Sequence, residues 1–140
     1  MESNKEKIAS ISFSTIDKGS RSAIKNRKFV VIRTGKEWED LWQLHKKTFL
    51  PEQQIPLVDF KQEMVIAFFS GEKRTGGYGI EIMRVEENLE KGQLEVFFLE
   101  THPSPNSMVI QALTQPYHIV KLKKVDIPVV FIAGNQSERT

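Results

Sequence analysis

The stretch GEKRTGGYGIEI, which begins at Gly71, holds the residues best placed to bind a phosphate or a nucleotide. Gly71 and Gly76 have the G-x-x-x-x-G spacing of a phosphate-binding P-loop, but Gly77 and Tyr78 follow where that motif requires Lys and then Ser or Thr. A P-loop also opens a helix, whereas the residues after Tyr78 alternate as in a strand. The dinucleotide-binding motif fails as well, because Gly77 and Gly79 are followed neither by its third glycine nor by a helix. We therefore expect no nucleotide and no other cofactor here.

The same stretch can instead be a loop between two strands, which we expect to pair. Hairpin connections usually have two to five residues, so a loop of about eight is either functional or a decorated turn. Gly76 and Gly77 permit positive φ and bare successive N–H groups that could dock a partner backbone or an anion. Lys73 and Arg74 place positive charge at the tip. A binding loop and a simple turn stay equally open, and both place the loop at the surface.

The titratable and nucleophilic residues form no recognisable catalytic or metal-binding motif. His45, His102 and His118 lack the H-x-x-x-H and H-E-x-x-H spacings of metal sites, and no serine occupies a G-x-S-x-G elbow. We expect His45 to complete an apolar helix face, and His102 and His118 to lie beside prolines at strand edges. A Ser, a His and an Asp from distant parts of the chain could still meet in space. The absence of cysteine excludes disulfides and thiolate chemistry, and we predict no bound metal and no enzymatic activity.

Charge and hydropathy exclude further partners. The chain has 20 basic and 18 acidic residues, too even a balance for a DNA-binding field. The basic stretch Lys18–Lys28 has no aromatic side chain to stack on bases, so we expect a solvated loop and no nucleic-acid partner. The longest apolar run, near Met64–Phe69, is far below the ~20 residues that span a bilayer, so we expect no membrane span. The polar start MESNKEKIAS lacks the apolar core of an export signal, which as written indicates a cytoplasmic chain.

One amphipathic helix is predicted in the stretch TGKEWEDLWQLHKKTF. Thr34 and Glu37 have the spacing of a capping box, and Pro51 forbids continuation. An apolar stripe at helical spacing must pack on a sheet, and it consists of Trp38, Leu41, Trp42, His45 and Phe49.

The remaining segments read as short strands. A weak strand contains Ile11, Phe13 and Thr15 and runs into an exposed loop. Stronger strands are expected in FVVIR (Phe29–Arg33, covered on both faces), MVIAFF (central), YGIEIMRV, QLEVFFLE, PYHIVKLKK and IPVVFIAG. NLEKGQ has the glycine of a tight hairpin, and the lysines of KLKK are expected to protect an exposed sheet edge.

These elements predict a mainly β (α+β) fold. Six to seven short strands with one packed amphipathic helix favour an antiparallel β-sandwich or an open barrel. A chain of 140 residues fits a single domain over residues 1–140, and we expect disorder in residues 1–10 and 135–140.

Two segments carry a family resemblance. VIAFFSGEKRTGGYGIEIMRV and THPSPNSMVIQALTQPYHIVKL resemble the C-terminal domain of the protease complex subunit PrcB family over about residues 65–123, and the upstream EWEDLWQLH and VDF are similar to what precedes that domain. The resemblance implies a non-catalytic partner of a subtilisin-like protease, in the cell envelope or outside the cell if an export signal has been removed. The predicted binding residues are Glu72, Lys73, Arg74, Thr75, Gly76, Gly77, Tyr78, Pro116 and Tyr117.

Two alternatives remain open at this point. The TGGY element is similar to part of the loop that chagasin-like cysteine-protease inhibitors insert into an active site, which implies protease inhibition. The N–H groups of Gly76 and Gly77 also suit a domain that binds a small ligand or an anion.

Overall fold

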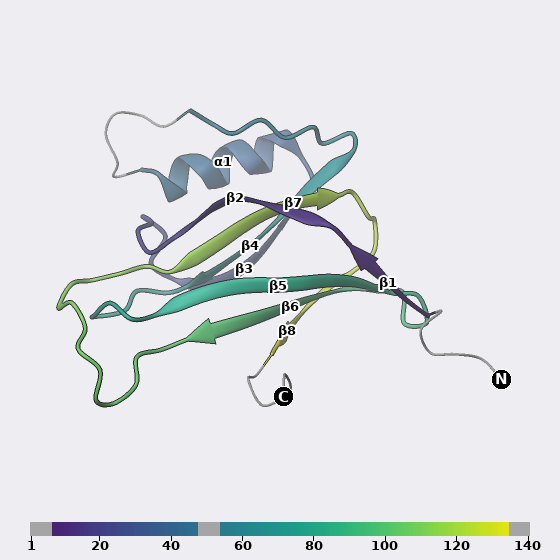
Figure 1. Ribbon diagram of the computed structural model, residues 1–140. Helices are drawn as coiled ribbons and strands as arrows, with labels where there is room; N and C mark the ends of the chain where they lie inside the picture. The colour runs from purple at the N-terminus through teal and green to yellow at the C-terminus, as the bar shows by residue number, and fades with distance from the viewer. Residues whose placement is uncertain (1–6, 48–53, 135–140) are drawn as a thin grey trace.

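The computed structural model describes residues 7–47 and 54–134 of the protein. Two β-sheets pack face to face, and the helix α1 lies on the outer face of one of them (Figure 1). Along the chain the elements are β1 (Ile8–Ile11), β2 (Phe13–Gly19), β3 (Arg27–Ile32), α1 (Gly35–His45), β4 (Glu63–Ser70), β5 (Gly79–Asn88), β6 (Gln93–Thr101), β7 (Tyr117–Lys123) and β8 (Val129–Ala133).

Each sheet has four strands. The helix-covered sheet has the order β2-β7-β4-β3, and the opposite sheet has the order β1-β5-β6-β8. The predicted sandwich with one packed helix is confirmed, but the described residues form eight strands instead of six to seven, and β6 pairs with β8 in parallel. The additional strand arises at Ser12, where the chain passes from one sheet to the other, so that β1 pairs with β5 and β2 with β7.

Strand β4 forms the centre of the molecule, as the sequence predicted. Because successive side chains of a strand point to opposite faces, its apolar residues serve two cores. All of them are buried: Met64, Ile66 and Phe68 face the opposite sheet, and Val65, Ala67 and Phe69 face α1. Each of these side chains except Ala67 contributes roughly 1.5–3 kcal/mol through burial.

The helix begins as its capping residues predict. The Thr34 side chain accepts a hydrogen bond from the Glu37 N–H, and the Glu37 carboxylate accepts one from the Arg33 N–H. Trp38 and the residues that follow on the same face are buried against the sheet: Leu41, Trp42 and His45. The predicted contributions of Phe49 and Pro51 lie outside the described residues.

One strand prediction is confirmed and another is wrong. The strand predicted in Phe29–Arg33 is present as β3 and is covered on both faces, because Val30 packs beneath α1 and Val31 packs between the sheets. It lies at the edge of its sheet, where Phe29 is 41% exposed and stacks on Phe68 at 4.2 Å between ring centroids. The KLKK lysines do not protect an edge, because β7 lies between β2 and β4. Lys121 instead forms an ion pair with Glu63 at 3.7 Å.

The predicted disorder and the predicted exposed loop are each wrong in part. Ile8 already belongs to β1, so order begins before residue 10, while residues 1–6 and 135–140 lie outside the described residues. In the loop after β2, Ser22 and Ile24 are buried because Ile24 packs into the core beneath α1. Among the residues that the structure describes, no helix has the length and apolar character needed to cross a bilayer.

Candidate binding surface

The glycine-rich loop, residues 71–78, does not connect paired strands. Strand β4 belongs to the helix-covered sheet and β5 to the opposite sheet, so the predicted pairing of these strands is wrong. Both edges of β4 are already occupied by β3 and β7, which leaves no free edge for β5. The loop therefore crosses one end of the sandwich from sheet to sheet.

The glycine-rich loop is held against the long loop, residues 102–116, which joins β6 to β7. Lys73 and Thr114 exchange two backbone hydrogen bonds, with N···O distances of 2.8 and 2.9 Å. The Gly76 N–H donates to the Ile110 carbonyl at 2.9 Å, and the Thr114 hydroxyl donates to the Thr75 carbonyl at 2.9 Å. These bonds span residues 73–76 of the glycine-rich loop, so the two loops form one hydrogen-bonded unit.

The loop 20–26, between β2 and β3, completes this end of the molecule. The Glu72 N–H donates to the Lys25 carbonyl at 3.1 Å, and the Gln115 N–H donates to the Ser20 carbonyl at 2.7 Å. The Gln115 side chain accepts a bond from the Ser22 N–H at 3.1 Å. We call the three loops together (20–26, 71–78 and 102–116) the loop end, which lies to the left in Figure 1.

The two central glycines of the loop have different roles. Gly77 has φ +92°, and a Cβ there would lie 2.9 Å from the Pro103 Cβ and 3.0 Å from a Val109 methyl group. Gly76 does not have a positive φ, and a Cβ there would make an ordinary contact of 3.7 Å with Ile110. Because the Gly76 N–H is bonded to Ile110, the expected pair of bare N–H groups for a partner or an anion is not present. Of these two glycines, only Gly77 has a conformation and surroundings that require glycine.

The structure brings most of the predicted binding residues together, but it separates two of them. Glu72, Arg74 and Gly77 are exposed, while a second group is partly buried: Lys73, Thr75, Gly76 and Tyr78. Pro116 and Tyr117 are buried. The Pro116 carbonyl accepts a hydrogen bond from the Ser70 N–H, and Tyr117 packs beneath α1. These two residues support the loop end from inside and do not form part of its surface.

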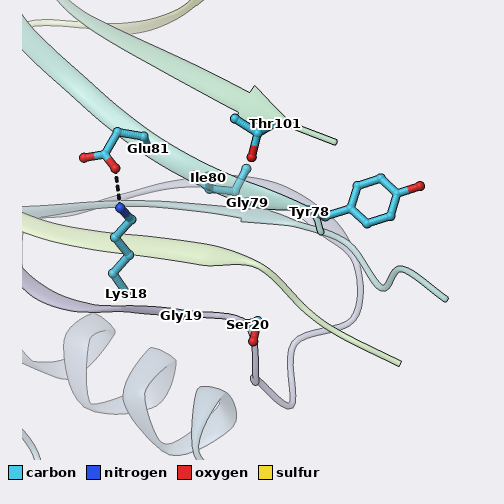
Figure 2. A pocket seen from close by; sticks show the side chains of 8 residues that line it. All are labelled: Lys18, Gly19, Ser20, Tyr78, Gly79, Ile80, Glu81 and Thr101. Carbon is cyan, nitrogen blue, oxygen red and sulfur yellow. Dashed lines mark hydrogen bonds and ion pairs between the residues drawn. The ribbon is translucent and has the colours of Figure 1, made fainter. Parts of the chain in front are cut away.

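Tyr78 was expected to anchor the loop through a buried ring, but its ring is only partly buried. The Lys73 ammonium lies 5.4 Å from the ring centroid, a cation–π contact. In Figure 2 the Tyr78 ring points away from the ion pair between Lys18 and Glu81. The ring is therefore held by Lys73 and is only partly covered by the protein.

Two shallow hollows flank Tyr78 and Gly79. The larger, of about 300 Å³, lies towards β2 and is lined by Lys18, Ser20 and Glu81 among others (Figure 2). The smaller, of about 160 Å³, lies towards Lys73 and His102. The larger volume is at the low end for a small-molecule site, and Lys18 and Glu81 neutralise each other within it. We therefore interpret both hollows as ordinary surface depressions and not as a small-molecule site.

Sequence reasoning missed three apolar side chains of the long loop. Met108 is 98% exposed, Ile110 75% and Leu113 59%, although all three are large and apolar. Met108 and Ile110 alternate as in a strand that faces a core, so sequence alone could not separate them from buried residues. What exposes them is the course of the long loop outside both sheets.

The structure does assemble a Ser, a His and an Asp, beneath α1. The His45 Nδ1 lies 2.7 Å from the Ser22 hydroxyl, and its Nε2 lies 2.9 Å from the Asp17 carboxylate. Burial raises the pKa of Asp17, but hydrogen bonds from His45 and Tyr117 and the charge of Lys46 outweigh burial and lower that pKa to about 2. The cluster thus contains a carboxylate that is ionised at neutral pH.

This cluster lacks what a nucleophile needs. Ser22 is 3% exposed and His45 is fully buried, and the Ser22 oxygen also accepts a bond from the Ile24 N–H. In a catalytic triad the histidine Nε2 faces the serine. Here Nδ1 faces Ser22 and Nε2 faces Asp17. No substrate carbonyl can approach the hydroxyl. The hydrogen bonds of the cluster instead tie α1 to β2 and β7. His45 is buried as predicted, but it is a polar link as well as part of an apolar face.

His118 is a correction to the sequence analysis. It was expected at a strand edge, but it is 1% exposed between the sheets, where its Nδ1 accepts a bond from the Ile82 N–H and its Nε2 faces the Thr15 hydroxyl. Burial lowers the pKa of His118 to about 4. His102 is exposed in the long loop. Within residues 7–47 and 54–134, no three His, Cys, Asp or Glu side chains gather as a metal site would require.

The fold and the loop end define a β-sandwich that presents a loop-built surface. Residues 64–123 match the model of a protein family described as PrcB C-terminal, so the resemblance carried by the TGGY element is confirmed. The matched span runs from β4 to β7 and includes the glycine-rich loop and the long loop. A search of curated proteins and a search of solved structures each found no match.

Proposed function

We propose that this chain is a non-catalytic accessory domain of a protease complex and that it binds a protein partner through the loop end. The observation that carries the proposal is the hydrogen-bonded union of the glycine-rich loop and the long loop inside the span that matches the PrcB C-terminal family. The partner we propose, following the family resemblance, is a subtilisin-like protease.

The union of the loops favours binding because it fixes the surface before a partner arrives. Association is opposed by the ordering of loops and side chains, and a pre-organised surface loses less of this freedom. Lys73, Thr75 and Gly76 are held by backbone or side-chain bonds to the long loop. Arg74 stands exposed between them and is free to meet a partner's carboxylate.

An accessory role agrees with the chemistry of the described residues. The one cluster of a serine, a histidine and an aspartate among them is buried and fully hydrogen-bonded, as described for Ser22. The exposed surface of the loop end carries basic and apolar side chains, which suit the recognition of a polypeptide.

We also propose that the chain works in the cell envelope or outside the cell, where its proposed protease partner would act. Sequencing the gene upstream of the codon for Met1 tests this placement. An in-frame apolar segment of about 7–15 residues would support export. A native start codon at Met1 would contradict it and favour the cytoplasm.

The proposed binding function is tested by affinity capture from the cells that make this protein. Tagged wild-type chain is compared with a Lys73→Ser/Arg74→Ser variant. The control variant is Lys61→Ser/Lys123→Ser, which removes the same charge from the opposite ends of β4 and β7. We expect a protease to be captured by wild type and control, and to be captured less by the loop variant, with the difference shrinking at high salt.

The activity of the captured protease on casein distinguishes an accessory domain from a protease inhibitor. An accessory domain leaves the protease active in the complex, whereas an inhibitor abolishes its activity at an equimolar ratio. Equal capture by all three chains, or capture of no protease at all, would contradict the proposal.

A further inference from the structure

The exposed apolar side chains of the long loop are not scattered. Single exposed apolar residues are common on protein surfaces, but Met108, Ile110 and Leu113 fall within one short segment. Apolar residues gathered in this way mark interaction sites. The long loop is also at the upper end of the ~12–15 residues beyond which an irregular connection is usually functional.

Positive charge surrounds this segment. The long loop contains no Asp or Glu. The two neighbouring loops, each hydrogen-bonded to the long loop, contribute four basic residues: Arg21, Lys25, Lys73 and Arg74. Their acidic residue, Glu72, accepts a hydrogen bond from the Gln115 side chain at 2.8 Å. The whole chain has a net charge of only +2, so the loop end holds more than its share of positive charge.

A polypeptide fits this surface better than a membrane. Loops that enter a bilayer interface usually carry Trp, Tyr or Phe, and residues 102–116 contain none of them. Methionine, in contrast, is common on surfaces that adapt to protein partners. The hydrogen bonds of Lys73 and Gly76 to the long loop fix the backbone that carries these apolar side chains.

We propose that the segment Met108–Leu113, together with Lys73 and Arg74, binds a stretch of a partner polypeptide in which apolar side chains are flanked by Asp or Glu. The apolar side chains of the partner would cover Met108, Ile110 and Leu113, and its carboxylates would pair with the basic residues around them. This inference rests on the proposed function, because it specifies the chemistry of the partner that the loop end recognises.

The experiment is the selection of a random peptide library, displayed on phage, on the immobilised full chain. We expect the selected peptides to be enriched in Leu, Met or Phe together with Asp and Glu. Binding of a selected peptide, measured by fluorescence polarisation, should weaken by about tenfold or more in Met108→Ser/Ile110→Ser/Leu113→Ser. It should also weaken in Lys73→Ser/Arg74→Ser, by a factor that shrinks as salt is raised.

The matched control is Leu44→Ser/Leu57→Ser/Leu89→Ser, which replaces three exposed apolar residues outside the loop end. This control should bind the selected peptides as wild type does. Melting curves check that each variant folds, and the single variant Met108→Ser replaces the triple one if the triple variant does not fold, because Met108 is almost fully exposed.

Three outcomes would overturn the inference. The first is selection without enrichment of acidic and apolar residues, and the second is peptide binding that the Met108 variants leave unchanged. The third is binding to phosphatidylserine vesicles, or self-association in the ultracentrifuge, that the Met108 variants abolish while no peptide is selected. If selection fails but protease capture still depends on Lys73 and Arg74, the proposed function stands and only this inference is wrong.

Discussion

Lys73 and Thr114 pair through two backbone hydrogen bonds of 2.8 and 2.9 Å and so join loops that follow different sheets. Lys73 follows β4 of the helix-covered sheet, and Thr114 lies on the way from β6 to β7. A change in the backbone of one loop must therefore shift the other. The loop end consequently responds to substitution as one unit.

The two glycines of the TGGY element should differ in their effect on stability. Gly77→Ala places a Cβ at positive φ and against Pro103, so we expect a loss of ~1–3 kcal/mol in the free energy of unfolding. Gly76→Ala meets only ordinary contacts, and we expect a change within about 0.5 kcal/mol. Urea denaturation measures both, and equal losses would show that Gly77 does not set the loop shape.

The helix should be strongly coupled to the sheet beneath it. Trp42 is 5% exposed and packs in the core between α1 and the helix-covered sheet, so Trp42→Ala should lower the free energy of unfolding by ~3–5 kcal/mol. Leu44→Ala, on the exposed side of the same helix, is the control and should change stability far less. A loss below about 1 kcal/mol for Trp42→Ala would mean that the helix is peripheral.

Acid should destabilise the fold through His118. The pKa of His118 in the folded state is about 4, below its ordinary value of 6.5, so the folded state favours the neutral ring. The contribution of neutral His118 to the free energy of unfolding is complete above pH 6.5. It is lost as the pH falls from 6.5 through about 4, because in this range the unfolded chain binds the proton and the folded chain does not. The expected loss is roughly 2–3 kcal/mol. Asp17 adds a further loss only below about pH 3.8, because its folded pKa is about 2.

The measurement is the free energy of unfolding between pH 7 and pH 4.5. In His118→Asn the decline over this range should become shallower, even if the variant is less stable at every pH. His102→Asn removes an exposed histidine and should keep the slope of the wild type. Identical slopes in wild type and His118→Asn would contradict the buried-histidine account.

The cluster of Ser22, His45 and Asp17 should be structural. We expect no turnover of p-nitrophenyl acetate or of a peptide substrate above the rate in buffer, because Ser22 is closed to solvent. Ser22→Ala should instead lower the free energy of unfolding by ~1–3 kcal/mol, since the Ile24 N–H and the His45 ring lose a buried partner. Turnover by the wild type that disappears in Ser22→Ala would mean that the chain is an enzyme.

Local patterns predicted most of the fold. The capping residues Thr34 and Glu37 and the stripe from Trp38 to His45 are read from neighbouring positions, and the structure contains them as expected. The position of a strand within its sheet depends instead on distant partners. The lysines of β7 therefore resembled those of an edge strand, although β7 lies between β2 and β4.

The candidate site was predicted less completely, for the same reason. The glycine-rich loop stood out through its composition, but its hydrogen bonds to Ile110 and Thr114 depend on the path of another loop. That path exposes Met108, whereas Tyr117 is buried beneath α1, and no local pattern distinguishes the two outcomes. His45 and Ser22 meet only because α1 packs over the loop that follows β2.

The most direct test of the central claim is site-specific photocrosslinking in the cells that make this protein. The photoreactive amino acid p-benzoylphenylalanine is placed at Met108, at the loop end, and in a separate chain at Leu57, which is 91% exposed elsewhere. If the loop end binds a protein partner, irradiation should join a second polypeptide to the Met108 chain alone, and Lys73→Ser/Arg74→Ser should weaken that crosslink. A crosslink of equal strength from Leu57, or none from Met108, would contradict the account.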